Sequence, residues 1–309
     1  MTASGEAMKA KVLLLGYGEM GHAFASLLRD RVELTIWQRH PAAGEVKMDV
    51  ATAVKASDVV IFCLPAVAHE DVLRQIAPNL SPHTICMSIA KGLDEQGRCV
   101  AQIFSQYLDH GNERGRYAFL YGPMIAEELS AGRQGFAELA AWHENILPGI
   151  RVLFRETRLV LRNTHDVLGC SWAVILKNVY ALLFGMVDGL QLGDNVRGYL
   201  SVSALQELAQ IVVTMGGQAG TAYSLAGLGD LITTATSRNS HHHALGLKLA
   251  AGDRTDVRGE GVHTLAMVRK HALLELAPYP LFALADAIVC GGMEPARAFE
   301  RHLIEINKS

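Results

Sequence analysis

Short apolar segments alternate with helix-like segments through the first half of the chain. The apolar segments have the length of strands, and the residues between them have the spacing of amphipathic helices. Strands that alternate with helices in this way predict a parallel, doubly wound sheet. Six strands are predicted, at residues 11–15, 33–39, 58–65, 83–90, 118–123 and 156–163.

The pattern changes after residue 165, where long apolar helical segments replace the alternation. Short turns such as GLGD and GGMEP separate these segments. We therefore predict an α/β chain with two domains, a cofactor-binding domain over 1–165 and an all-helical substrate-binding domain over 166–309. The predicted helices of the second domain lie at 167–190, 196–216, 242–252, 261–276 and 280–292.

Composition narrows the classes of partner. A formal charge of −3 and a pI near 6.5 give no basic surface for nucleic acid or an anionic membrane, so a small molecule is the expected partner. The five cysteines are scattered and form no pair at metal or redox spacing. Because the first residues also lack the pattern of a signal peptide, a cytoplasmic location is predicted.

The segment 167–187 is long enough to span a bilayer, and its only charged residue is Lys177. A charge at mid-membrane depth is costly, so we predict a buried helix rather than a membrane span.

Three glycines follow the first predicted strand in the pattern GxGxxG, at Gly16, Gly18 and Gly21. The first permits a tight turn, the second lets the backbone approach a pyrophosphate, and the third lets the helix pack on the strand. This context, with a strand before and a helix after, predicts a Rossmann-type dinucleotide site.

The end of the second strand bears on the choice of cofactor. NAD-specific sites usually carry an acidic residue there, whereas this chain has Trp37-Gln38-Arg39-His40. Arg39 is suited to a 2′-phosphate, which favours NADP over NAD; the alternative is a solvated surface arginine.

A lysine in the middle of an otherwise uncharged helix is costly to bury unless its charge is paired or its pKa is lowered. Lys177 is such a residue, and it is suited to supply a proton to a carbonyl oxygen during reduction. Asp230 is a candidate partner for it. The alternatives are a lysine that snorkels to the surface and an aspartate that caps a helix.

The stretch SRNSHHHALG (237–246) precedes a predicted helix. Consecutive histidines on a helix point about 100° apart, which argues against a single metal site. An anion clamp and a solvated helix start remain open.

Eight motifs occur in order along nearly the whole chain: GYGEMG, FCLPA, SIAKGL, YGPMIAEE, ILKNVYAL, GLQLGDN, LAGLGDLITTATS and GEGVHT. With these motifs the chain resembles the NAD(P)-dependent glycerol-3-phosphate dehydrogenases of the bacterial type, as a divergent member. That resemblance implies a second domain like the C-terminal domain of 6-phosphogluconate dehydrogenase.

The resemblance implies roles for residues in these motifs. Lys177 would give or take the carbonyl proton, Lys91 would contact substrate and nicotinamide, and Asp230 would orient Lys177 and the substrate hydroxyls. Substrate-binding residues would be Lys91, Gly122, Asn178, Thr234, Arg238 and Asn239. Cofactor-binding residues would be Gly16, Tyr17, Gly18, Glu19, Met20, Gly21, Arg39, Pro65, Lys91, Ala126, Arg258 and Glu260.

The sequence departs from the family pattern in three places. Met124 stands where the family usually has a serine, and the segment 136–142 matches weakly and is interpreted as a surface or a lid. In the substrate-phosphate arm, an alignment with a short deletion places Arg238 and Asn239 on the phosphate. The alignment without a gap places Ser240, His241 and His242 there, and arginine is the better phosphate ligand.

The resemblance therefore implies a cytoplasmic NAD(P)-dependent dehydrogenase that favours NADP and forms a homodimer. Its reaction would interconvert sn-glycerol 3-phosphate and dihydroxyacetone phosphate for phospholipid biosynthesis. The resemblance implies no metal. One alternative is a related two-domain reductase of another keto or hydroxy acid. The other is a redox sensor that binds NADP without turnover; such a sensor needs no buried proton donor.

Overall fold

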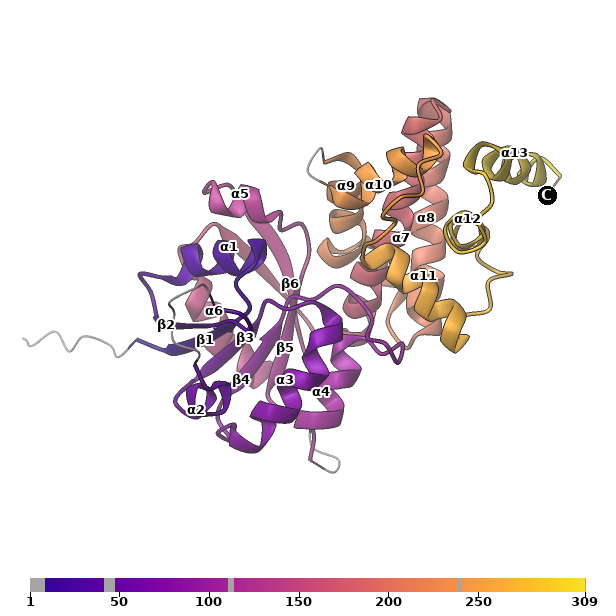
Figure 1. The fold of residues 1–309 in the computed structure, drawn as a ribbon. Helices are drawn as coiled ribbons and strands as arrows, with labels where there is room; N and C mark the ends of the chain where they lie inside the picture. Colours follow the sequence, from indigo (N-terminus) through magenta and orange to yellow (C-terminus); the bar gives the residue numbers. More distant parts are fainter. Residues whose placement is uncertain (1–8, 42–47, 111–113, 238–239, 309) are drawn as a thin grey trace, which may run out of the picture. The chain divides into compact units, whose positions relative to one another are not determined.

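The computed structural model describes residues 9–41, 48–110, 114–237 and 240–308 (Figure 1). The chain forms two compact units. Unit 1 consists of Met1–Ala90, Ile103–Leu120 and Met124–His165, and unit 2 of Lys91–Gln102, Tyr121–Pro123 and Asp166–Ser309. The predicted single division at residue 165 stays a prediction, and two short segments of the first half cluster with unit 2.

Unit 1 is built on a seven-stranded sheet, which confirms the predicted α/β class. The strand order is β2-β1-β3-β4-β5-β6-β7. The pairs β1–β2, β1–β3, β3–β4, β4–β5 and β6–β7 are parallel. The strands are β1 (Lys11–Leu15), β2 (Glu33–Trp37), β3 (Val59–Phe62), β4 (Ile85–Ser88), β5 (Tyr117–Tyr121), β6 (Gly135–Ala141) and β7 (Leu159–Thr164).

Helices cover both faces of this sheet, as a doubly wound fold requires (Figure 1). One face carries a core to which Phe24 of α1, Leu129 of α5 and Phe154 of α6 contribute. On the other face an aromatic cluster joins Phe62 and Phe104. The helices are α1 (Glu19–Leu28), α2 (Val50–Lys55), α3 (His69–Ile76), α4 (Val100–Leu108), α5 (Ala126–Ser130) and α6 (Leu147–Phe154).

Strand β6 corrects the interpretation of residues 136–142 as a surface or a lid. All its residues except Phe136 are buried, and it lies between β5 and β7. The local signal is weak because β6 contains Glu138 and three alanines, which have low strand propensity. Its position between two strands, which local sequence does not reveal, overrides that propensity.

Unit 2 is helical and is organised around α7 (Val167–Gly189), which packs against α8, α9, α10, α11 and α12. By length and composition α7 could cross a membrane, but almost all of it is buried inside the fold, which confirms the predicted buried helix. The remaining helices are α8 (Asp194–Thr214), α9 (Asp230–Thr236), α10 (His241–Ala250), α11 (Glu260–His271), α12 (Pro280–Val289) and α13 (Pro295–Ile306).

Three local features of unit 2 differ from the sequence prediction. The GLGD turn is a π-helical turn, Leu225–Gly229, that leads directly into α9. Helix α11 ends at His271, five residues early, because Ala272 adopts a left-handed conformation with φ of 49°. Helix α13 was not predicted; Glu294 caps it by accepting hydrogen bonds from the backbone N–H groups of Ala296 and Arg297.

Candidate active site

The glycine turn of unit 1 has the backbone that a dinucleotide site requires. Gly16 has φ of 94°, and a Cβ there would lie 2.5 Å from the carbonyl oxygen of Cys63. A Cβ on Gly21 would overlap the carbonyl oxygen of Gly16, whereas one on Gly18 would meet open space. The turn therefore packs tightly on the protein side and is open at Gly18, which caps α1 without a side-chain hydrogen bond.

Strand order places this turn at the topological switch point of the sheet. The order reverses between β1 and β3, and ligands of open parallel sheets bind outside the carboxyl ends of the strands at such a point. The glycine turn follows β1, and Pro65 follows β3. Both are predicted cofactor residues, as are Tyr17, Glu19, Met20 and Ala126, which also belong to unit 1.

Arg39 lies just beyond β2 and is half exposed, with its guanidinium 3.7 Å from the carboxylate of Asp71. An exposed pair of this length is weak, so Arg39 is free to exchange Asp71 for a more highly charged anion. Its role in NADP binding stays a prediction.

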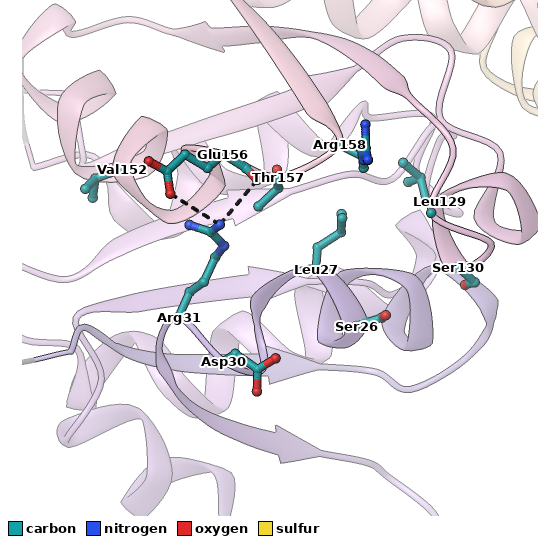
Figure 2. A pocket seen from close by; sticks show the side chains of 11 residues that line it. Ser26, Leu27, Asp30, Arg31, Leu129, Ser130, Val152, Glu156, Thr157 and Arg158 are labelled. Atoms are coloured by element: carbon teal, nitrogen blue, oxygen red, sulfur yellow. Dashed lines mark hydrogen bonds and ion pairs between the residues drawn. The ribbon is translucent and has the colours of Figure 1, made fainter.

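A surface pocket of unit 1 lies elsewhere, at the carboxyl end of α1 (Figure 2). Arg31 donates to the backbone oxygen of Glu156 (3.2 Å) on its rim, and its guanidinium lies 3.7 Å from the carboxylate of that residue. None of the predicted site residues lines this pocket.

Two lysines of unit 2 share one carboxylate. Lys177 Nζ lies 3.2 Å from Asp230 Oδ2, and Lys91 Nζ lies 2.8 Å from the same oxygen. Lys177 also donates to Thr234 Oγ1 (2.6 Å), and Lys91 donates to the backbone oxygen of Gly122 (3.0 Å). The predicted pairing of Asp230 with Lys177 is confirmed, and the snorkelling alternative is wrong because Lys177 is only 5% exposed.

Burial lowers the pKa of Lys177 from 10.5 to about 8. The carboxylate of Asp230 opposes this shift by favouring the ammonium, whereas the positive charge of Lys91 adds to it. A lysine with a pKa near 8 exchanges its proton readily at neutral pH, which is what a proton donor to a developing alkoxide requires.

Asn178 connects this cluster to α11. Its Nδ2 donates to the backbone oxygen of Lys91 (3.2 Å) and to Glu260 Oε2 (3.1 Å). Its buried Oδ1 has no hydrogen-bond partner among the described residues, so it is available to a ligand hydroxyl. Burial raises the pKa of Glu260, an effect that the nearby positive charge of Lys177 opposes.

Local structure explains how these side chains converge. Lys177 and Asn178 project from the middle of α7, and Asp230 and Thr234 lie one turn apart on α9. The π-helical turn before α9 depends on Gly227, because a Cβ there would overlap the carbonyl oxygen of Ala222.

The histidines of the predicted phosphate arm occupy the start of α10, with Ser240 as its cap. His242 Nε2 accepts a hydrogen bond from the N–H of Gly261 (3.4 Å), and His243 Nε2 lies 2.7 Å from Asp188 Oδ2. Burial and the charge of Lys177 lower the pKa of His242 to about 3, so its ring is neutral. His241 is exposed.

The rival residues of the deletion alignment, Arg238 and Asn239, lie outside the described residues. In the part of the chain that the structure describes, no group of three histidine, cysteine, aspartate or glutamate side chains is arranged to hold a metal ion.

Arg258 is not drawn into the cluster. It is exposed and pairs with Asp256 two residues away. The structure thus brings together Lys91, Gly122, Lys177, Asn178, Asp230, Thr234 and Glu260 in unit 2. One further residue near a predicted cofactor residue is His69, whose ring hydrogen-bonds to the backbone oxygen of Pro65. A lone histidine in the segment AVAHEDV gives no local signal of that contact.

Two family models match the chain. The model described as the N-terminus of NAD-dependent glycerol-3-phosphate dehydrogenase matches residues 41–145, and the model described as its C-terminus matches residues 166–300. The match to the N-terminal model begins after the glycine turn, so the assignment of that turn as a dinucleotide site is supported by its geometry and not by this match.

Individual proteins give the same result. A glycerol-3-phosphate dehydrogenase (NAD(P)+) of Mycobacterium avium is 30% identical over 96% of this chain and 95% of its own, and one of Moorella thermoacetica is 31% identical over 86% and 87%. Among solved structures, a glycerol-3-phosphate dehydrogenase of Coxiella burnetii has a TM-score of 0.80 at 24% identity, and the match covers 96% of this chain and 99% of that one.

A ketopantoate reductase of Ralstonia eutropha shares the fold. Its TM-score is 0.55 at 15% identity, and the match covers 95% of this chain and 99% of that one.

Proposed function

Because the chain belongs to the family of NAD-dependent glycerol-3-phosphate dehydrogenases, we propose that it interconverts sn-glycerol 3-phosphate and dihydroxyacetone phosphate with NAD(P). The observation that carries this proposal is the buried carboxylate of Asp230, shared by Lys177 and Lys91. A neutral, apolar ligand would not interact favourably with these buried charges, whereas the ammonium groups stabilise negative charge that develops on a carbonyl oxygen.

The glycine turn fits a dinucleotide, because its backbone is bare at Gly18 and no side chain could be added at Gly16 or Gly21. Gly16, Gly18 and Gly21, with Pro65, would hold the cofactor. When bound, its nicotinamide supplies or accepts the hydride.

In the reductive direction, Lys177 donates a proton to the substrate oxygen as negative charge develops on it. Asp230 holds the ammonium of Lys177 in place, and Thr234 fixes its direction. Lys91, anchored by Gly122, adds a second positive charge, and Asn178 Oδ1 accepts a substrate hydroxyl. In the oxidative direction the neutral amine of Lys177 takes the proton back.

The primary experiment is steady-state oxidation of NADPH and NADH with dihydroxyacetone phosphate. Turnover is expected, and no turnover with either cofactor despite tight cofactor binding would contradict the proposal. K177A should lower kcat by about 100- to 10,000-fold with little change in cofactor affinity, because it removes the proton donor. K55A, at an exposed position of α2, is the control.

The start of α10 favours one second candidate, a reductase of a different anionic substrate. The described residues there offer imidazoles, and a neutral imidazole binds phosphate more weakly than a guanidinium does. R238A and H241A should be compared for the KM of dihydroxyacetone phosphate; the variant that raises KM strongly identifies the phosphate ligand. If neither does, keto acids without phosphate should be assayed.

We also propose that NADP is preferred, that the protein is cytoplasmic and that it forms a homodimer. R39A should shift the NADPH-to-NADH preference toward NADH, and an unaltered preference would remove Arg39 from cofactor choice. Light scattering on the purified full chain tests the dimer.

A further inference from the structure

A fully buried histidine in unit 1 belongs to none of the roles assigned above. His69, the first residue of α3, is 0% exposed. Its ring stacks on Phe62 at a centroid distance of 5.2 Å and lies 5.8 Å from the ring of Phe104. These aromatic contacts fix the plane of the imidazole, and with it the directions of its two nitrogens.

Both ring nitrogens have partners. Nδ1 lies 3.0 Å from the backbone oxygen of Pro65, and Nε2 lies 2.9 Å from Ser88 Oγ. A carbonyl oxygen only accepts, so Nδ1 carries the proton and Nε2 of the neutral ring is the acceptor. Ser88 therefore donates its hydroxyl proton to His69 and, through the same oxygen, accepts the N–H of Ala90 (3.2 Å).

Every link in this chain thus has a defined direction. Ala90 donates to Ser88, Ser88 donates to His69, and His69 donates to Pro65. A neutral imidazole places one donor nitrogen and one acceptor nitrogen at different positions of a rigid ring, which suits these two partners. Burial lowers the pKa of His69 to about 4, so the ring keeps this neutral form at physiological pH.

The two ends of the chain of hydrogen bonds lie at the carboxyl ends of adjacent strands. Pro65 follows β3, and the Gly16 turn packs on the carbonyl of Cys63, the residue directly after that strand. Ala90 follows β4 and directly precedes Lys91 in the sequence. His69 therefore connects the segment after β3, on which the glycine turn packs, with the end of β4. Both lie at the edge of the sheet where a ligand binds in this type of fold.

We propose that His69 is a positioning residue for the cofactor: through Ser88 and Pro65 it holds the ends of β3 and β4 at the spacing that the bound dinucleotide requires. Within the proposed function, this inference rests on the binding of a dinucleotide cofactor and not on turnover. His69 does not touch the reacting atoms, and its effect is transmitted through backbone groups that it bonds.

The test measures the Kd of NADPH by fluorescence titration, together with kcat and the melting temperature, for H69L, S88A and the double variant H69L/S88A. H69L leaves the Ser88 hydroxyl and the Pro65 carbonyl without their partner, so both stability and affinity should fall, the Kd rising about tenfold. H83L is the matched control, because it makes the same histidine-to-leucine change at an exposed position just before β4.

The double variant separates positioning from stability. It also removes the stranded Ser88 hydroxyl, so the melting temperature should recover part of the loss while the Kd stays as high as in H69L. A Kd that recovers together with the melting temperature would show a purely structural role and overturn the inference, as would an H69L Kd within twofold of the wild type.

Two conservative variants keep the inference testable if H69L does not fold. H69N retains a nitrogen donor near the Nδ1 position and should keep the Pro65 link, whereas H69Q places its amide near the Nε2 position and should keep only the Ser88 link. Each variant keeps one of the two links and the proposal needs both, so both should raise the Kd of NADPH; a Kd within twofold of the wild type in either variant would contradict the proposal. Absence of turnover in the wild type with intact NADPH binding would refute the proposed function but leave this inference standing.

Discussion

Lys177 is the residue whose ionisation should control the reaction. Its pKa is lowered to about 8 because burial penalises the ammonium. Reduction needs the protonated amine, so its kcat should fall as pH rises through about 8. Oxidation needs the neutral amine, so its kcat should rise over the same interval. Rates measured in both directions between pH 6.5 and 9.5 check this; flat profiles would remove Lys177 from the proton transfer.

Asp230 should set the position of that transition. Its carboxylate stabilises the ammonium of Lys177, so D230N should lower the pKa of Lys177 and move the reductive profile to lower pH. The expected loss of kcat at pH 7 is then partly recovered by assaying at lower pH. A loss that does not depend on pH would mean that Asp230 acts on the substrate alone.

Residue-scale sequence reasoning reached part of this site. A lone lysine in an apolar helix and an aspartate after a glycine turn are visible without a structure, and their pairing is confirmed. That Lys91 lies even closer to Asp230 was not foreseen, because the two residues are 139 positions apart and nothing local links them.

At the scale of elements, the crossing of α7 and α10 depends on two glycines. A Cβ on Gly246 would overlap the carbonyl oxygen of Leu182, and one on Gly185 would overlap the carbonyl oxygen of His243. G246A must push the helices apart and should destabilise the protein by about 1–3 kcal/mol, the typical cost of overpacking, measured by urea unfolding. It should also disturb His242, which lies on the same helix.

The control for that substitution is G198A, in the second turn of α8, where an added Cβ meets open space. Alanine has the higher helix propensity, so G198A should leave stability unchanged or raise it by up to about 1 kcal/mol. Equal losses in G246A and G198A would show that the close helix approach is not what Gly246 provides.

Glu207 of α8 anchors the start of α12. Its buried carboxylate accepts the backbone N–H groups of Leu281 (2.6 Å) and Phe282 (2.9 Å), and the hydroxyl of Tyr180 (3.1 Å). E207A leaves these buried donors without a partner and should lower the free energy of unfolding by about 3 kcal/mol or more. E300A, at an exposed position of α13, should change it by less than about 0.5 kcal/mol. Similar losses in the two variants would refute the anchoring role.

On the scale of the whole molecule, buried neutral histidines make stability depend on pH. His69 has an ordinary pKa of 6.5 that burial lowers to about 4 in the folded state. Above pH 6.5 the ring is neutral in both states and its contribution is complete. Between pH 6.5 and 4 only the unfolded chain takes up the proton, so stability falls by about 1.4 kcal/mol per pH unit for this residue.

The comparison of wild type with H69L isolates this effect, since other titrating groups are common to both proteins. The stability advantage of the wild type should shrink as pH falls from 6.5 toward 4, as followed by urea unfolding at fixed ionic strength. A constant difference across that interval would show that His69 is not buried as a neutral ring.

The sequence by itself determined the features that depend on neighbours along the chain. Periodicity located six strands and the long helices, the glycine pattern located the turn after β1, and an uncharged context marked Lys177. These signals are local because dihedral preference and amphipathic spacing act over a few residues.

Only the tertiary structure decided what depends on residues far apart in the chain. It buried β6 between two strands despite its alanines and Glu138, and it placed Lys91 and Lys177 on one carboxylate. It also set His69 between Pro65 and Ser88. The physical reason is that burial and long-range hydrogen bonds outweigh local propensity, and neither can be predicted from the residues that are adjacent in sequence.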